Sequence, residues 1–161
     1  MTQSIDEKLQ RATCAIHRGG GNGTGWLCSN EGHILTAAHV LGETKPEDGF
    51  TVNVTFVDKQ KPFESLARLE HWYYDKKKGI DFAVLKLVDI PPNREPLPMS
   101  LAKEVAPRSQ IRLYGYGTKL TYLSSGIGEF VGRYSVQNIS DYTLFLFKSD
   151  ELNIGGFSGG L

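Results

Sequence analysis

Three residues far apart in this chain have the chemistry of nucleophilic catalysis: His39, Asp81 and Ser158. Ser158 lies between glycines in the segment 155–160 (GGFSGG). A serine hydroxyl is a weak nucleophile at neutral pH and needs a neighbouring base. Free imidazole titrates near pH ~6.5 and can take up and return the serine proton. A carboxylate can hold the imidazole in the reactive tautomer, and His, Asp, Ser is a known chain order for such a triad.

The glycines beside Ser158 suit a loop whose backbone N–H groups converge on one point. We therefore expect the N–H groups of Gly156 and Ser158 to form an oxyanion hole, in which each donor lowers the barrier by roughly 3 kcal/mol. Asp75 is the alternative to Asp81 as the acidic residue, but three lysines follow it, which is typical of a solvated loop.

No metal or cofactor is expected, because the remaining histidines lack the spacing of metal ligands. We interpret these three as structural or surface residues: His17, His33 and His71.

Short β-prone segments separated by turn residues must position these groups. A capping-box pattern, Ser4 followed by Glu7, predicts a short helix over residues 5–11. The strands expected from the sequence cover residues 13–16, 24–28, 33–36, 51–57, 66–70, 82–87, 110–116, 127–134 and 142–147. Four prolines in residues 91–98 predict an extended connector between two sets of strands.

This pattern predicts an all-β fold of two β-barrels in series. Residues 1–90 form the first barrel with His39 and Asp81, residues 91–108 the connector, and residues 109–161 a partial second barrel with Ser158. The second set is short of a closed barrel by about two or three strands, and unpaired edges favour association. We therefore expect the chain to be a fragment, truncated just after the Ser158 loop, of a longer protein with a C-terminal region that regulates or targets it.

The motifs resemble those of trypsin-like serine peptidases, in the style of the bacterial HtrA/DegP branch. The matching segments are 23–28 (GTGWLC), 33–40 (HILTAAHV), 81–87 (DFAVLKL), 113–117 (LYGYG) and 149–160. The resemblance implies two six-stranded antiparallel barrels of the chymotrypsin type and a serine endopeptidase acting on peptides or proteins. By the family offset, Leu152 should lie near the base of the substrate pocket and favour a small or medium apolar residue.

Phe157 departs from the family pattern, which usually has aspartate or asparagine at that position. Another interaction must then hold the nucleophile loop, or the loop forms only with a partner or substrate.

Two alternatives to an endopeptidase remain open. The chain could be a catalytically silent peptide-binding or scaffold module, or an esterase-like hydrolase that uses the same triad on small acyl substrates.

Composition limits the expected binding partners and the expected cellular location of the protein. Eighteen basic and eighteen acidic residues cancel, so neither nucleic acid nor an anionic membrane is an expected partner. No apolar run approaches the ~20 residues of a membrane helix, and no signal peptide is visible. We therefore expect a cytoplasmic location, unless a preceding segment has been removed.

Two cysteines are too few for a disulfide framework. If residues 12–18 and 24–30 pair as a hairpin around the glycines at 19–23, then Cys14 and Cys28 lie near one another. We expect two buried thiols that act as small apolar residues, with a disulfide as the alternative.

Overall fold

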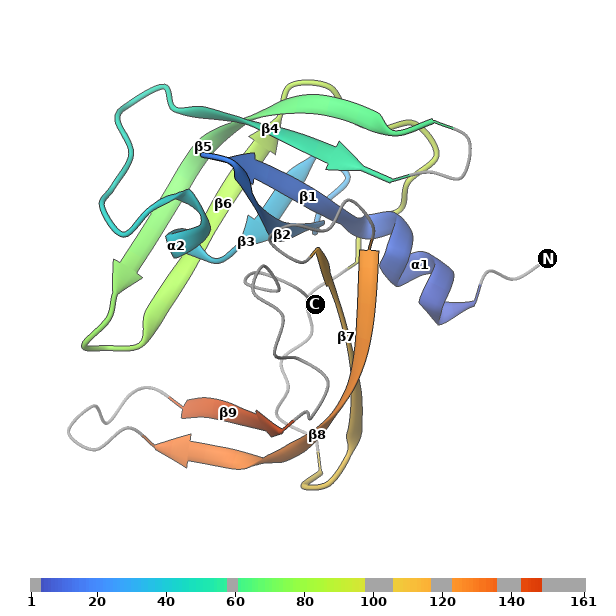
Figure 1. Cartoon of the computed structure of the whole chain (residues 1–161), viewed down its shortest axis with the longest axis vertical. Helices are drawn as coiled ribbons and strands as arrows, with labels where there is room; N and C mark the ends of the chain where they lie inside the picture. The colour runs from blue at the N-terminus through green and yellow to red at the C-terminus, as the bar shows by residue number, and fades with distance from the viewer. Residues whose placement is uncertain (1–3, 58–60, 98–105, 117–122, 136–142, 149–161) are drawn as a thin grey trace.

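The computed structural model describes residues 4–57, 61–97, 106–116, 123–135 and 143–148. These residues form a closed six-stranded barrel, a separate three-stranded sheet and a helix packed beside both (Figure 1). The all-β class and the first barrel expected from the sequence are confirmed. Neither helix of the described residues is long and apolar enough to cross a membrane.

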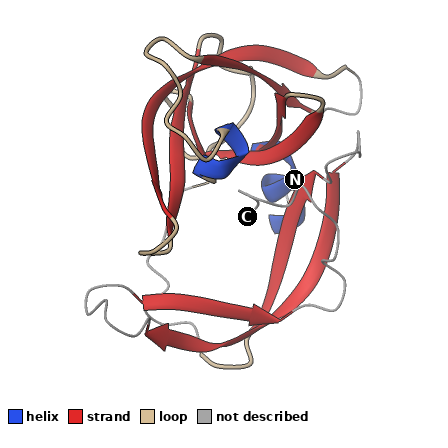
Figure 2. Cartoon of the chain, turned by 60° about the vertical axis from the view of Figure 1, so that its left-hand side comes forward, coloured by secondary structure: helices blue, strands red, loops and turns tan. Residues whose placement is uncertain are grey.

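The barrel is built from six antiparallel strands in the closed order β1-β2-β3-β6-β5-β4. The strands are β1 (Thr13–Arg18), β2 (Gly21–Leu27), β3 (His33–Thr36), β4 (Thr51–Phe56), β5 (Phe63–Asp75) and β6 (Ile80–Leu87). Figure 2 shows these strands as a ring, with the short helix α2 (Ala38–Leu41) at its rim.

The barrel core follows from the alternation of buried and more exposed residues, which is clearest along β4 and β6. Side chains of successive residues point to opposite faces of a strand, so every second residue faces the interior. Val52, Val54 and Phe56 are the buried residues of β4, and Ala83 and Leu85 are buried on β6. Burying side chains of this size contributes about 1.5–3 kcal/mol for each large one, and this core supports the strand ends where α2 lies.

The N-terminal helix α1 (Ile5–Ala12) confirms the predicted capping box. The Ser4 hydroxyl accepts from the Glu7 N–H at 3.2 Å, and the Ser4 N–H donates to Glu7 Oε2 at 3.1 Å. The helix ends at β-branched Thr13, whose hydroxyl donates to the Leu9 carbonyl at 2.7 Å. The chain therefore passes directly from α1 into the first barrel strand.

The second sheet has the order β7-β8-β9, with β7 (Gln110–Tyr116), β8 (Leu123–Ser135) and β9 (Thr143–Lys148). Its first strand contacts the barrel, because the Tyr116 N–H donates to Thr24 Oγ1 at 2.8 Å. It also contacts α1, since Asp6 accepts from the Tyr114 hydroxyl at 2.9 Å and pairs with Arg112. A complete second barrel, and the division of the chain at residues 91–108, stay predictions.

Several element bounds differ from those expected. β8 begins at Leu123 instead of residue 127, because its first half pairs with β7 along the whole of that strand. β5 runs from Phe63 to Asp75 instead of 66–70, because its first half pairs with β4 while its whole second half pairs with β6. Only Gly19 and Gly20 form the turn of the first hairpin, and their φ angles are +56° and +84°. The glycines from Gly21 onward belong to β2. The helix α2 was not predicted.

Candidate active site

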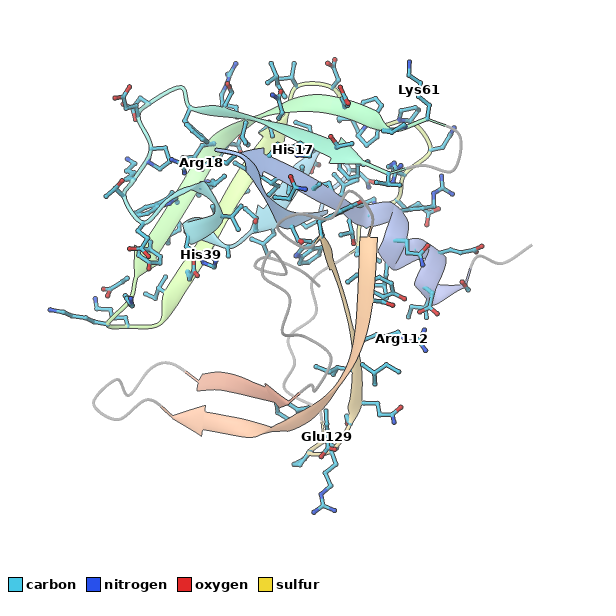
Figure 3. All side chains as sticks on the ribbon, viewed as in Figure 1. His17, Arg18, His39, Lys61, Arg112 and Glu129 are labelled. Atoms are coloured by element: carbon cyan, nitrogen blue, oxygen red, sulfur yellow. The ribbon has the colours of Figure 1, made fainter. Side chains whose placement is uncertain are left out.

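His39 lies on α2, which begins two residues after β3 ends at Thr36. Ala38 and Leu41 are fully buried and anchor this short helix to the barrel. The His39 side chain is 39 % exposed, on the barrel rim that faces the second sheet (Figure 3). The histidine is therefore held on a packed element while its ring stays accessible to a substrate.

Asp81 reaches His39 through the register of two neighbouring strands. β3 pairs with β6 so that Thr36 lies opposite Ala83. Asp81 is two residues from Ala83 on the same strand, and it therefore lies beside the chain that turns into α2. The pairing register thus brings together two residues that are 42 positions apart in sequence.

The two oxygens of the Asp81 carboxylate hold His39 at two points. Oδ2 lies 2.5 Å from His39 Nδ1, and Oδ1 accepts the backbone N–H of His39 at 3.0 Å. The residue at the N-cap of α2, Ala37, makes no side-chain cap bond, so Asp81 supplies the missing acceptor from the adjacent strand. Because a carboxylate only accepts, Nδ1 carries the proton and Nε2 carries the lone pair that a general base needs.

Gly23 gives α2 the room it occupies. A Cβ at this position would lie 2.3 Å from Val40 Cγ1 and 2.8 Å from Val40 Cγ2. Any side chain at residue 23 would therefore push against the residue next to His39. The neighbouring strands are also tied together there, because the buried Thr36 hydroxyl donates to the Thr24 carbonyl at 2.7 Å.

Comparison of the sequence with models of protein families identifies the family of this chain. Residues 23–161 match the model of the trypsin-like peptidase domain. The chain belongs to the trypsin-like peptidase family. It is therefore a serine protease-type hydrolase domain, and the resemblance inferred from its motifs is confirmed.

Solved structures share the fold of this trypsin-like domain at low sequence identity. The MamO protease domain from Magnetospirillum magneticum in its apo form is 17 % identical, with a TM-score of 0.65, 97 % of this chain covered and 79 % of that one. Deg5 is 21 % identical, with a TM-score of 0.67 and coverage of 96 % and 74 %. The serine endoprotease from Yersinia pestis is 22 % identical, with a TM-score of 0.62 and coverage of 99 % and 53 %. A search of curated protein sequences found no significant match.

The other predicted site residues of the trypsin-like domain lie outside the described residues. These are the candidate nucleophile Ser158, the second oxyanion-hole residue Gly156 and the candidate pocket residue Leu152. Their roles stay predictions. In the part of the chain that is described, no group of three histidine, cysteine or acidic side chains is arranged to hold a metal ion.

Asp75, the alternative acidic residue, has a different role in the structure. It lies at the tip of the β5–β6 hairpin, where its Oδ1 accepts the N–H groups of Lys77 and Lys78 at 3.0 and 3.1 Å. These bonds close the turn, as expected for a solvated loop. Asp81 is therefore the acidic residue that meets His39.

Two aromatic residues beside the acid were missed by the sequence analysis. Tyr74 lies opposite Asp81 across the hairpin and Trp72 lies opposite Ala83. Their rings are 5.9 Å apart, and both pack against the barrel core. The signal was the run of residues 71–75 (HWYYD), whose alternate members face the side of the strand that carries Asp81.

Both cysteines are free thiols, as expected, but only Cys14 is buried, whereas Cys28 is partly exposed. Cys14 is fully buried and lies opposite Gly25 in the first hairpin. Burial raises the pKa of both the Cys14 and the Cys28 thiols above their usual value. A raised thiol pKa lowers the thiolate fraction, so neither residue is set up as a nucleophile.

Proposed function

We propose that this trypsin-like domain is a serine endopeptidase that cleaves peptide bonds with His39, Asp81 and Ser158. The observation that carries the proposal is the double contact of Asp81 with His39, at Nδ1 and at the backbone N–H. A carboxylate that only stabilised the barrel would need neither a ring nitrogen nor an accessible imidazole. Membership of the trypsin-like peptidase family supports Ser158 as the third member.

In the proposed reaction, Ser158 Oγ attacks the carbonyl carbon of the substrate while His39 Nε2 takes the hydroxyl proton. The N–H groups of Gly156 and Ser158 stabilise the negative oxygen of the tetrahedral intermediate. The C–N bond then breaks, the amine leaves with the proton from His39, and an acyl-enzyme remains. A water molecule then attacks the carbonyl carbon of the acyl-enzyme while His39 Nε2 takes its proton. The bond to Ser158 breaks, Ser158 Oγ receives that proton from His39, and the acid product leaves.

Asp81 has two effects in this scheme. Its Oδ2 keeps the proton on Nδ1, so that Nε2 faces the serine as a base, and its negative charge stabilises the imidazolium that forms. Its Oδ1 fixes the start of α2 and thereby the position of the whole histidine. The ring is thus oriented before a substrate binds, which lowers the entropy cost of reaching the reactive geometry.

Peptides or proteins are the substrate class of a trypsin-like peptidase domain. We propose that Leu152 contributes to the base of the pocket for the residue preceding the scissile bond, which then favours small or medium apolar side chains. A library of peptide substrates that differ only at this residue tests the preference. Faster cleavage after Lys or Arg than after Ala or Val would contradict it.

Fluorophosphonate labelling, followed by intact-mass measurement, tests the activated serine directly. The probe should add to one site in the 161-residue chain, and Ser158→Ala and His39→Ala should each abolish the addition. If neither the folded chain nor a longer protein that contains it is labelled, the catalytically silent peptide-binding module, which Phe157 favours, becomes the better account. Competition between peptides and small esters for the labelled site separates an endopeptidase from an esterase.

The same assay tests whether further strands complete the site. A longer protein that contains this chain should be labelled, and should turn over peptide, far faster than the 161-residue chain. Equal specific activity in both would show that residues 1–161 are sufficient for the activity.

A further inference from the structure

The β5–β6 hairpin extends beyond the barrel as a two-stranded ribbon (Figure 1). β4 pairs with β5 only as far as Arg68, and β3 pairs with β6 only as far as Ala83. Among the described residues, 73–75 and 80–82 therefore pair in strands only with each other. The inner face of this ribbon carries Asp81, and its outer face has no role in the proposed catalysis.

Aromatic side chains form a continuous row on this outer face. The Tyr73 and Phe82 rings face each other across the strands at 4.8 Å, and the His71 ring stacks on Tyr73 at 6.3 Å with an interplanar angle of 17°. Tyr73 is 49 % exposed and Phe82 42 % exposed. Farther along the hairpin, the cross-strand pair Arg68 and Lys86 separates these rings from the exposed Leu66 and Val88.

Tyr73 and Phe82 are two of the eight large apolar side chains that are exposed in the described part of the chain, and their rings are in direct contact. Single exposed apolar residues are normal on a protein surface, but a contiguous group marks an interaction site. We call the row of His71, Tyr73 and Phe82, together with the hairpin tip at residues 75–79, the hairpin face.

The tip of the hairpin face is positively charged. Lys76, Lys77 and Lys78 are all exposed, and the nearby acid is Asp75, whose Oδ2 lies 3.8 Å from Lys78 Nζ. Three cations against one carboxylate leave an excess of two positive charges beside the aromatic row. At the barrel end of the face the charges balance more closely: Arg68 and Lys86 lie opposite each other in register, while Glu70 pairs with His33 at 3.3 Å and Glu31 lies near Lys86.

We propose that the hairpin face is an exosite that binds an extended polypeptide segment with acidic residues at one end and apolar or aromatic residues next to them. The carboxylates would meet the lysines of the tip, and the apolar side chains would pack on the three rings. Alternate side chains of an extended chain repeat every ~6.6 Å, close to the 6.3 Å between the rings of His71 and Tyr73. The side chains on one face of an extended peptide, which are those of alternate residues, can therefore lie on neighbouring rings.

The distribution of charge favours a polypeptide over a nucleic acid. A groove for single-stranded nucleic acid needs cations that follow the phosphate backbone along its whole length. On the hairpin face the excess positive charge is confined to the tip, and the chain as a whole has no net charge. The exosite would bind its partner whether or not Ser158 is active, because none of its residues belongs to the proposed triad.

Selection from a displayed library of random 15-residue peptides on the full Ser158→Ala chain tests the proposal. The enriched peptides should combine Asp or Glu with aromatic or large aliphatic residues. Fluorescence anisotropy then measures their affinity for variants. Tyr73→Ser/Phe82→Ser should weaken binding about tenfold or more, since exposed aromatic anchors carry much of the energy of such interfaces. The matched control is Ile127→Ser, which removes a 51 % exposed apolar side chain from β8 and should leave affinity unchanged.

Charge reversal at the tip gives a second, independent readout. Lys76→Glu/Lys77→Glu/Lys78→Glu alters only exposed turn residues, so folding is retained, and it should also weaken binding about tenfold or more at low salt. Lys8→Glu/Lys45→Glu/Lys61→Glu replaces three exposed lysines away from the hairpin, changes the net charge by the same amount, and is therefore the control for net charge.

Three results would overturn the proposal. The enriched peptides could bind the hairpin variants as tightly as the parent. Their binding could be lost in His39→Ala but not in the hairpin variants, which would make them ligands of the active site. A labelled single-stranded oligonucleotide could bind through the same residues more tightly than any peptide, which would make the hairpin face a nucleic-acid surface.

Discussion

The two oxygens of Asp81 can be separated by a single substitution. Asp81→Asn keeps a carbonyl oxygen that can accept the His39 backbone N–H, as Oδ1 does at 3.0 Å. It places an NH₂ group where Oδ2 now lies 2.5 Å from Nδ1. An amide N–H facing Nδ1 requires the imidazole proton to move to Nε2, and the ring can then no longer accept the serine proton.

The expected magnitudes differ sharply for rate and for stability. Loss of the correct tautomer lowers kcat about 10⁴-fold in triads of this kind, equivalent to ~5 kcal/mol of barrier at 1.36 kcal/mol per decade. The side chains of the pair are 39 % and 33 % exposed, so solvent screening limits its contribution to folding to about 1 kcal/mol or less. Asparagine caps a helix as well as aspartate does, so the free energy of unfolding should hardly change.

Asp81→Ala is the matched comparison, because it removes both oxygens. It should lose activity to a similar extent and also lose about 1 kcal/mol of stability with the cap of α2. The rate of fluorophosphonate labelling gives the first quantity and urea unfolding the second. An asparagine variant that keeps more than a tenth of the labelling rate would refute the catalytic role of Oδ2. Equal stability of the two variants would refute the capping role of Oδ1.

Three further predictions concern the surroundings of individual described residues: a glycine, the two cysteines and a buried tyrosine. Gly23→Ala should destabilise the fold by about 1–3 kcal/mol and slow fluorophosphonate labelling, because the new Cβ would overlap the Val40 side chain. Adding Val40→Ala should restore part of the stability and part of the labelling rate. If neither urea unfolding nor labelling recovers, the overlap with Val40 is not the cause. Iodoacetamide should modify Cys28 before the fully buried Cys14 in the folded chain, and peptide mass mapping that finds equal rates would disprove the order. Burial raises the pKa of Tyr116 from about 10 to about 12, so the folded state holds this proton more tightly. Its contribution to stability is complete below pH ~10 and is lost toward pH ~12, at up to ~1.4 kcal/mol per pH unit. Tyr116→Phe should therefore flatten this alkaline decline in unfolding experiments, and an unchanged slope would contradict the assignment.

Much of the fold could be predicted because most of the strands are short and their patterns are local. β3 and β7 begin and end where the sequence predicts, and the capping box alone located α1 to within one residue. Local signals failed where an element depends on its neighbours. The bounds of β5 follow from two different partners along one strand, with a register shift between Leu69 and His71. The helix α2 has four residues and no side-chain cap of its own, so nothing near it in sequence indicated a helix.

For the candidate site, the sequence by itself determined which residue types could act and in which order they come. His39, Asp81 and Ser158 stand in motifs that identify a trypsin-like peptidase before any fold is known. Only the tertiary structure decided that Asp81 meets His39 while Asp75 closes a turn, because that choice depends on the pairing of β3 with β6. Only the structure also showed that one carboxylate both orients the ring and caps its helix, and that the opposite face of the same hairpin carries an exposed aromatic row. Residue types are local properties, whereas the distance between two side chains is set by every strand that packs between them.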